Sequence, residues 1–370
     1  MSIFDIVGQD IAIERLQRAR KALRVPHGYI FAGPEGVGKH LLAREWAKLL
    51  LCEKPVSKKT ASGEFADSCG QCPECKLLES GGHPDLHLIY KELARYIPEL
   101  KERKLLDLAK KVIDVFVIDK MEGYPVRGQA KIFLIDGAED MNRQTQNALL
   151  KTLEEPPPST FIILVTSQPD LLLPTVRSRC QQINFLGLPE DFTRRKLVEN
   201  GVDQNQAAWW ASFTEGKLGY ALKFAKLNLY PVKCQMLESL ADFTAAQVLE
   251  TAAWMVEKAK EFGENYLEGR ENYSKSDADR QGMGFLLEVQ AYAFRQALRS
   301  QAGLLGAQVV DQQQVIIKIG ARFGLEGSSA AIRSAARAQR NLESNVNPAL
   351  IFESLLLNYL DYVRAAARAG

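Results

Sequence analysis

A glycine-rich loop that ends on a lysine constrains this chain more than any other feature of its sequence. The loop contains Gly33, Gly36 and Gly38, ends on Lys39, and follows the apolar run 29–32. Its glycines permit a backbone whose N–H groups all point at a phosphate, and the lysine adds a positive charge beside them. The pattern predicts a strand, a phosphate-binding loop and a helix in that order. The alternative is a glycine-rich turn without a ligand.

Apolar runs and helical patterns alternate through the first half of the chain. The runs 131–136 and 161–166 are typical of buried strands. Helical spacing occurs over 10–23, 40–51 and 142–153. Strands that alternate with helices predict an α/β fold with a parallel sheet covered on both faces. After Pro189 the pattern is helical as far as the end.

Two positions around the loop differ from those of an efficient nucleotide hydrolase. The residue after the lysine is His40, where a serine or threonine would offer its hydroxyl to Mg²⁺; a neutral imidazole is a poor ligand for this hard cation. Asp136 ends an apolar strand and can orient a metal ion, but Gly137 follows where a glutamate usually activates water. Glu139 and Asp140 come next, and we expect them to point elsewhere as solvated residues of a helix start.

A cluster of cysteines with the spacing C-x16-C-x2-C-x2-C follows the loop. The cluster consists of Cys52, Cys69, Cys72 and Cys75. Zn²⁺ binds four thiolates tetrahedrally, and two C-x2-C turns that share one cysteine bring three sulfurs together. Four cysteine ligands leave no open position for water, so we predict a structural zinc site rather than a catalytic one. The alternative is a set of unrelated thiols. The nearby His83 and His87 are surplus to such a site.

The bulk composition fits a cytoplasmic protein. The 47 basic residues nearly cancel the 45 acidic ones, so a global basic field for nucleic acid is lacking, although a local patch stays open. The first residues lack the pattern of a secretory signal, and the apolar runs fall short of the ~20 residues that span a membrane. The isolated Cys180 and Cys234 are interpreted as reduced thiols.

Several motifs along the chain share one resemblance. They are F-D-I-V-G-Q at 4–9, C-G-Q-C-P-E-C at 69–75, N-A-L-L-K-T-L-E-E-P-P at 147–157, R-S-R-C at 177–180 and N-L-E-S-N-V-N-P-A-L at 341–350. Together they resemble the bacterial clamp-loader subunits of DNA polymerase III, which belong to the AAA+ class. The reduced nucleotide motifs are similar to the delta-prime type rather than the gamma/tau motor type. Gly219, where the family normally carries a sensor arginine, agrees with this.

The resemblance implies three domains and a place in a ring. An AAA+ core over 1–188 would carry the zinc module at 52–80, a helical lid would cover 189–242, and a helical collar over 243–370 would oligomerise. The subunit would complete the ring as a stator and help to load the sliding clamp onto primed DNA. Its partners would be gamma/tau-like and delta-like subunits, the sliding clamp and, through the complex, primer-template DNA. ATP could be bound, and we do not expect it to be hydrolysed.

The resemblance also implies roles for individual residues. Arg179 would act in trans as an arginine finger on the nucleotide of a neighbouring subunit, with Arg177 as the weaker choice. Thr166 or Ser167 would occupy the sensor 1 position in a vestigial form. The loop glycines, Lys39 and Asp136 would hold any bound nucleotide. The alternative for Arg179 is a surface arginine or one that pairs within the core.

Two other classes of function remain open. In the first, the chain is itself an ATP-hydrolysing motor of the gamma/tau kind. In the second, the zinc module binds DNA and the P-loop fold is only its scaffold. Lys54, Lys58 and Lys59 favour DNA binding, but acidic residues in the same stretch oppose it. These are Glu53, Glu64, Asp67, Glu74 and Glu79.

Overall fold

The chain forms two compact units. The computed structural model describes residues 1–60, 63–101, 107–268, 274–304, 311–343 and 346–369. The first unit comprises Met1–Thr193 and Glu215–Tyr220, and the second comprises Arg194–Thr214 and Ala221–Gly370. The division into core, lid and collar stays a prediction.

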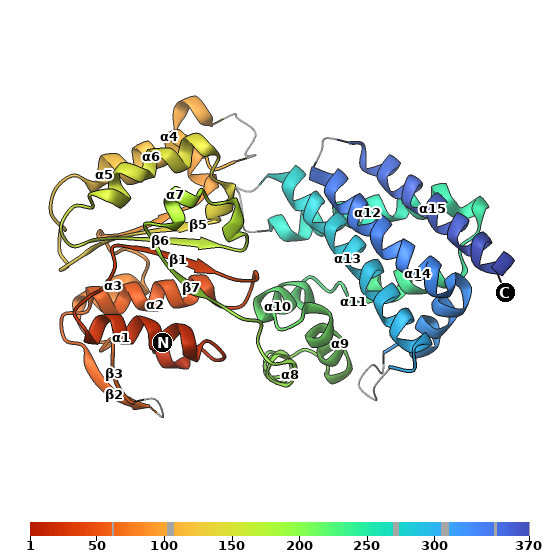
Figure 1. Ribbon diagram of the computed structural model, residues 1–370, viewed down its shortest axis with the longest axis horizontal. Helices are drawn as coiled ribbons and strands as arrows, with labels where there is room; N and C mark the ends of the chain where they lie inside the picture. The colour runs from red at the N-terminus through yellow and green to blue at the C-terminus, as the bar shows by residue number, and fades with distance from the viewer. Residues whose placement is uncertain (61–62, 102–106, 269–273, 305–310, 344–345, 370) are drawn as a thin grey trace. The chain divides into compact units, whose positions relative to one another are not determined.

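A parallel five-stranded sheet lies at the centre of the first unit (Figure 1), with the strand order β4-β5-β6-β1-β7. Its strands are β1 (Gly28–Ala32), β4 (Leu86–Ile89), β5 (Lys131–Asp136), β6 (Thr160–Thr166) and β7 (Gln181–Asn184). The three strands in the middle of the sheet are buried along almost their whole length, as both faces of a parallel sheet are when helices cover them. The predicted α/β fold with a parallel sheet is confirmed.

Alternate residues of these strands face two separate cores. Tyr29 and Phe31 pack with Trp46 on one face, whereas Ile30 and Phe133 belong to the core of the other. Helices α1 to α3 cover the first face and α4 to α7 the second (Figure 1). Their bounds are α1 (Asp10–Lys21), α2 (Lys39–Leu51), α3 (Pro73–Glu79), α4 (Lys110–Ile113), α5 (Asp119–Met121), α6 (Arg143–Glu154) and α7 (Pro174–Arg177).

Short helical turns connect these elements. They are η1 (Ile3–Asp5), η2 (Lys91–Tyr96), η3 (Pro98–Leu100), η4 (Asp114–Ile118, a π-helical turn), η5 (Ala138–Asp140) and η6 (Pro169–Leu171). Local sequence signals set both ends of α6. The side chain of Asn142 accepts a hydrogen bond from the N–H of Thr145 (3.0 Å) at the start of α6. The prolines that follow Glu155 end the same helix.

A hairpin that the sequence pattern did not predict lies between the first two cysteines of the cluster. Its antiparallel strands are β2 (Val56–Thr60) and β3 (Gly63–Asp67). Gln17 of α1 fastens it to the unit. The side-chain amide of Gln17 donates to the carbonyl oxygen of Ala66 (2.7 Å) and accepts from its N–H (3.1 Å). The strands are polar and largely exposed, so they lack the apolar alternation by which strands are predicted.

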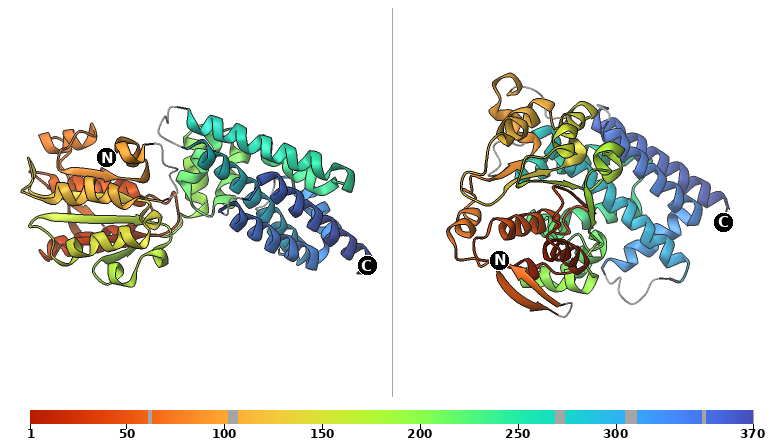
Figure 2. Two further views of the ribbon diagram at one scale, coloured as in Figure 1. Left: turned by 90° about the horizontal axis from the view of Figure 1, so that it is seen from above. Right: turned by 60° about the vertical axis from the view of Figure 1, so that its left-hand side comes forward.

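The second unit is helical, as the sequence predicted. Its helices are α8 (Glu190–Glu199, shared with the first unit), α9 (Gln204–Thr214), α10 (Leu218–Lys226, likewise shared), α11 (Tyr230–Asp242), η7 (Ala245–Gln247), α12 (Val248–Leu267), α13 (Lys275–Gln301), α14 (Gln313–Glu343) and α15 (Pro348–Ala369). The four long helices α12 to α15 pack along one another (Figure 2). Gly324, at φ +65°, interrupts α14 with a kink.

Phe294, Phe323 and Tyr359 join three of these helices through edge-to-face ring contacts. Within the 341–350 motif, residues 344–345 lie outside the described part of the chain. None of the described helices combines the length and the apolar character that crossing a bilayer requires.

Candidate nucleotide site and metal centre

The glycine-rich loop runs from the end of β1 into α2. Gly38, at φ +99°, occupies the N-cap of the helix in a conformation that glycine adopts readily. The side chain of Lys39 is buried, and its ammonium donates to the carbonyl oxygens of Gly33 (2.6 Å) and Pro34 (2.7 Å). Burial lowers the pKa of Lys39, and the nearby Glu139 opposes this shift. The predicted strand, loop and helix are therefore present, and the lysine is folded over the loop.

The segment around Gly219 packs directly against this loop through its backbone. The Gly219 N–H donates to the carbonyl oxygen of Gly36 (2.8 Å). A Cβ atom added at Gly219 would lie 3.1 Å from the Cα of Gly36, which is too close for ordinary packing. The position where the resemblance implies a sensor arginine is therefore filled by a backbone contact, and a side chain there would displace the loop.

The turn after β5 brings Glu139 to the site, although the sequence analysis expected this carboxylate to point elsewhere. Asp136 ends the strand in an exposed position, and Gly137, at φ +70°, turns the chain into η5. This turn directs Glu139 back to β6, where Ser167 donates to its carboxylate from the backbone N–H (3.0 Å) and from Oγ (2.5 Å). Burial alone would raise the pKa of Glu139, but the hydrogen bonds from Ser167 lower it below its usual value. The expectation that Glu139 points away from the site was wrong.

The positions of Thr166, Asp140 and His40 complete the description of the surroundings of the loop. Thr166 is buried at the end of β6, and its carbonyl oxygen accepts the N–H of Gly33 (3.2 Å), so it adjoins the loop. Asp140 turns aside and forms an ion pair with Lys91 (3.5 Å). His40 is exposed at the start of α2, and its role as a bystander stays a prediction.

Arg179 lies on the surface just after α7. Its guanidinium forms an ion pair with Glu154 at the end of α6 (2.6 Å) and donates to the carbonyl oxygen of Thr175 (2.9 Å). About a third of its side chain is exposed (35%). Arg177 instead pairs with Asp170 (2.9 Å). Arg179 is thus a surface arginine held in place by an acid of its own chain, and its role as a finger stays a prediction.

The structure gathers the predicted cysteine cluster into one site. The cluster of Cys52, Cys69, Cys72 and Cys75 has all four sulfurs within 4.8 Å of one another. Two of the Sγ–Sγ distances, Cys52 to Cys72 and Cys69 to Cys75, are 4.0 Å. A tetrahedral ion with Zn–S bonds of about 2.3 Å requires sulfurs about 3.8 Å apart, so the arrangement fits such an ion.

The surroundings of the sulfurs also suit a cation. Backbone N–H groups of Gln71 and Cys72 donate to the sulfur of Cys69 and lower its pKa to about 6. Burial raises the pKa of Cys52 and of Cys75. These buried thiols require a bound cation to remain thiolates at neutral pH. The cluster could therefore hold a metal ion.

A buried polar cluster that the sequence analysis missed joins the cysteine-bearing helix α3 to the sheet. Glu74, between two of the cysteines, contacts Nε2 of the buried His83 (2.9 Å) and the guanidinium of Arg127 (3.1 Å). Asp85 accepts three backbone N–H groups, from residues 126–128, at 2.6 to 2.8 Å. His83 is thus an anchor for α3, in agreement with its being surplus to the metal set.

The contacts of Lys58 bear on the alternative of a DNA-binding zinc module. Its ammonium is engaged within the unit, where it donates to the hydroxyl of Ser2 (3.0 Å) and lies 3.9 Å from Asp67. The charge of this lysine is therefore partly offset by an acid of the same unit.

A parallel sheet whose first strand leads through a glycine-rich, lysine-ended loop into a helix is the arrangement typical of P-loop proteins. Comparison with known families narrows this class. Residues 8–189 match the family described as DNA polymerase III, delta subunit. Together with the relatives below, the match over these residues supports a clamp-loader subunit of the AAA+ class that is delta-prime-like, as the motifs predicted.

Individual relatives agree with this assignment. The chain is 38% identical to the DNA polymerase III subunit delta' of Pseudomonas aeruginosa over 42% of each chain. It is 30% identical to the delta' subunit of Escherichia coli over 62% of this chain and 63% of that one. It is also 36% identical to the tau/gamma subunit of Haemophilus influenzae over 54% of this chain and 26% of that one. The chain thus spans between about a quarter and somewhat under two thirds of the length of these relatives.

Among solved structures, a gamma-subunit-related protein of Thermotoga maritima aligns with 94% of this chain and 99% of its own. The TM-score is 0.45 at 16% identity, a likeness too weak to carry an argument about function.

Proposed function

We propose that this chain is a delta-prime-like stator that completes a clamp-loader ring and lends Arg179 to the nucleotide of a neighbouring subunit. The supporting observation is a contrast between two parts of the first unit. The chain's own loop lacks a metal-binding hydroxyl after Lys39, whereas Arg179 stands on the surface and is held by Glu154. A guanidinium stabilises the charge that spreads over a transferring phosphoryl group.

The proposal includes the partners that such a ring requires. These are gamma/tau-like and delta-like subunits, the sliding clamp and, through the assembled complex, primer-template DNA in the cytoplasm. We also propose that the helices over 243–370 act as the oligomerising collar. The cysteine cluster would hold a structural Zn²⁺, since four cysteine ligands leave no position for water.

The finger is tested in reconstituted complexes that contain either the wild-type chain or Arg179→Ala. We expect ATP hydrolysis stimulated by clamp and DNA to fall, while the subunit stoichiometry is unchanged. Arg179→Lys should rescue poorly, because an ammonium cannot reproduce the planar two-pronged contact of a guanidinium. Arg177→Ala tests the weaker candidate in the same assay, since that side chain pairs separately with Asp170. Equal rates for wild type and Arg179→Ala in fully assembled complexes would show that Arg179 is not a finger.

One observation favours the alternative of an active motor. Glu139 lies beside Ser167, just after the carboxyl end of the central strand β6. One of its carboxylate oxygens is buried without a hydrogen-bond partner among the described residues. Such a carboxylate could take the role of the water-activating glutamate whose usual position is occupied here by Gly137. We nevertheless expect negligible turnover from the isolated chain, because His40 offers Mg²⁺ no hydroxyl. Steady-state turnover of about 1 s⁻¹, the low end for typical enzymes, that disappears in Lys39→Ala would favour the motor instead.

A further inference from the structure

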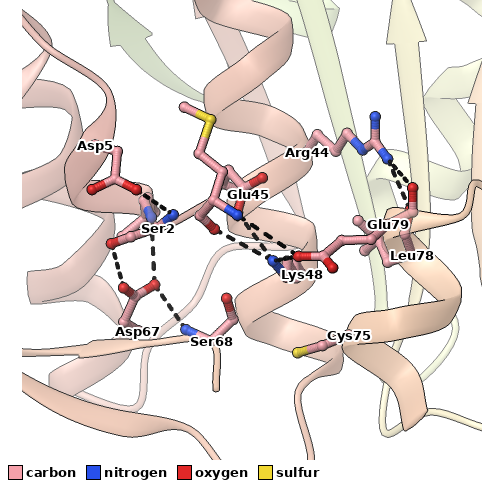
Figure 3. A network of polar contacts seen from close by, with 12 residues as sticks. Ser2, Asp5, Arg44, Glu45, Lys48, Asp67, Ser68, Cys75, Leu78 and Glu79 are labelled. Atoms are coloured by element: carbon pink, nitrogen blue, oxygen red, sulfur yellow. Dashed lines mark hydrogen bonds and ion pairs between the residues drawn. The ribbon is translucent and has the colours of Figure 1, made fainter. Parts of the chain in front are cut away.

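The first residues of the chain form a strap, residues 2–9, that runs between the cysteine cluster and the phosphate-binding loop. At its start the strap is held by Asp67, which is 4% exposed at the end of β3. The carboxylate of Asp67 accepts hydrogen bonds from the Ser2 hydroxyl and from the N–H of Ile3 (3.4 Å), as Figure 3 shows for the labelled residues. It also accepts the N–H of Ser68 (2.8 Å), the residue before Cys69.

A buried lysine holds the chain just ahead of the strap. Lys48 of α2 is 1% exposed, and its ammonium donates to the carboxylate of Glu79 (2.5 Å) and to the carbonyl oxygen of Met1 (3.3 Å) (Figure 3). Lys48 precedes Cys52 by one helical turn, and Glu79 follows Cys75 by one turn. Asp67 contacts the strap, and Lys48 and Glu79 hold Met1 just ahead of it. These three residues belong to the segments that also carry the cysteines.

The other end of the strap contacts the phosphate-binding loop. Gln9 is 3% exposed, and its side-chain amide donates to the carbonyl oxygens of Val37 (3.1 Å) and Leu186 (2.9 Å). Between the two ends, Ile3 and Ile6 are buried in the core on the α2 face of the sheet. A displacement at Asp67 can therefore reach the loop through a short, packed segment.

We propose that Asp67 and Lys48 are positioning residues through which a metal ion in the cysteine cluster holds the strap, and through it the phosphate-binding loop, in the geometry that binds nucleotide. The inference rests on the metal site proposed above and on the expectation that the loop can bind ATP, and it adds a coupling between the two. Its physical basis is the ordering of short segments. A metal ion crosslinks the end of α2, the segment after β3 and the start of α3, and its loss removes the constraint that fixes these three segments relative to one another.

The test compares the metal-loaded and chelated forms of the full chain by amide hydrogen exchange of residues 2–9 and 33–38. Chelation should raise exchange in both segments of the wild type, and re-added ZnCl₂ should reverse the change. In Asp67→Asn, exchange of the strap should already be raised with metal bound, and chelation should add little. Glu64→Gln is the matched control, an acid-to-amide change on the same strand whose carboxylate binds Ser57 and not the strap.

A spectroscopic readout separates this role from simple damage to the metal site. Replacement of the metal by Co²⁺ should give the same thiolate absorption bands in the wild type, Asp67→Asn and Glu64→Gln. The proposal fails if the strap of the wild type exchanges equally with and without metal, or if Asp67→Asn keeps the full response to chelation. If chelation unfolds the whole unit, which raised exchange in β6 would reveal, the test compares strap exchange in the metal-loaded forms alone. Strap exchange in Asp67→Asn equal to that of the wild type would then overturn the proposal.

A second arm measures the affinity for a fluorescent adenine nucleotide. We expect chelation to weaken binding by about fivefold or more, the lower range of coupling between two sites. Asp67→Asn should bind with this weaker affinity whether or not metal is present. A wild-type chain that binds no nucleotide would contradict the expectation that the loop holds ATP, whereas the exchange experiment would still decide whether metal and loop are coupled.

Discussion

Replacement of Gly36 by alanine should destabilise the first unit more than the same replacement of Gly81. The two glycines have nearly the same backbone, with φ of +75° and +77°. They differ in their surroundings. A Cβ at Gly36 would lie 2.7 Å from the backbone nitrogen of Tyr220, whereas a Cβ at Gly81 meets nothing within 4 Å among the described residues. The pair therefore separates backbone strain from the contact between the loop and the segment around Gly219.

The expected magnitudes follow from these two terms. A side chain in the left-handed region costs about 1–2 kcal/mol, and both variants carry this cost. Overpacking against a backbone atom that cannot rotate away costs about 1–3 kcal/mol more, and only Gly36→Ala carries it. We expect a loss of about 1–2 kcal/mol for Gly81→Ala and of about 2–5 kcal/mol for Gly36→Ala.

Native-state hydrogen exchange in β1 and β6, followed through a urea series, measures the unfolding free energy of the first unit by itself. A local readout is needed because a chain with two units need not unfold in one step. Equal losses for the two variants would refute the reasoning, since the loop would then move away from Tyr220 without cost.

Two further predictions concern the metal and pH. Protein purified without added zinc should contain one Zn²⁺ per chain, and Cys72→Ser should release it and loosen residues 52–80 while the sheet persists. Metal content near zero in folded protein would contradict the site. Burial lowers the pKa of His87 to about 4, whereas the unfolded chain has a histidine pKa of about 6.5. The unfolded state therefore takes up the proton first, and stability should be lost as the pH falls from about 6.5 towards 4. His87→Gln should remove this part of the pH dependence in urea unfolding, and an unchanged profile would show that His87 is not its source.

The sequence by itself determined the elements with a strong local pattern. The apolar runs of β1, β5 and β6 are flanked by turn residues, and the helices beside them carry apolar stripes. The secondary structure of each element can therefore be predicted from a short stretch of sequence. The glycine loop and the cysteine set are likewise local, because their chemistry lies in residue type and spacing. Cys52 was the exception, since it is far from the other three in sequence and was included by its place at the end of a predicted helix.

Only the tertiary structure decided the features that depend on pairing between distant segments. The strands β4 and β7 are short and lie at the two edges of the sheet. The polar hairpin β2–β3 is held by hydrogen bonds to Gln17, which belongs to helix α1. Glu139 reaches Ser167 because Gly137 adopts a positive φ, which residue type permits but does not require. Asp67 lies only two residues before Cys69 in the sequence, yet its partners Ser2 and Ile3 are more than sixty residues away. Such contacts leave no periodic trace, because the packing of the whole unit, not the local chain, brings their atoms together.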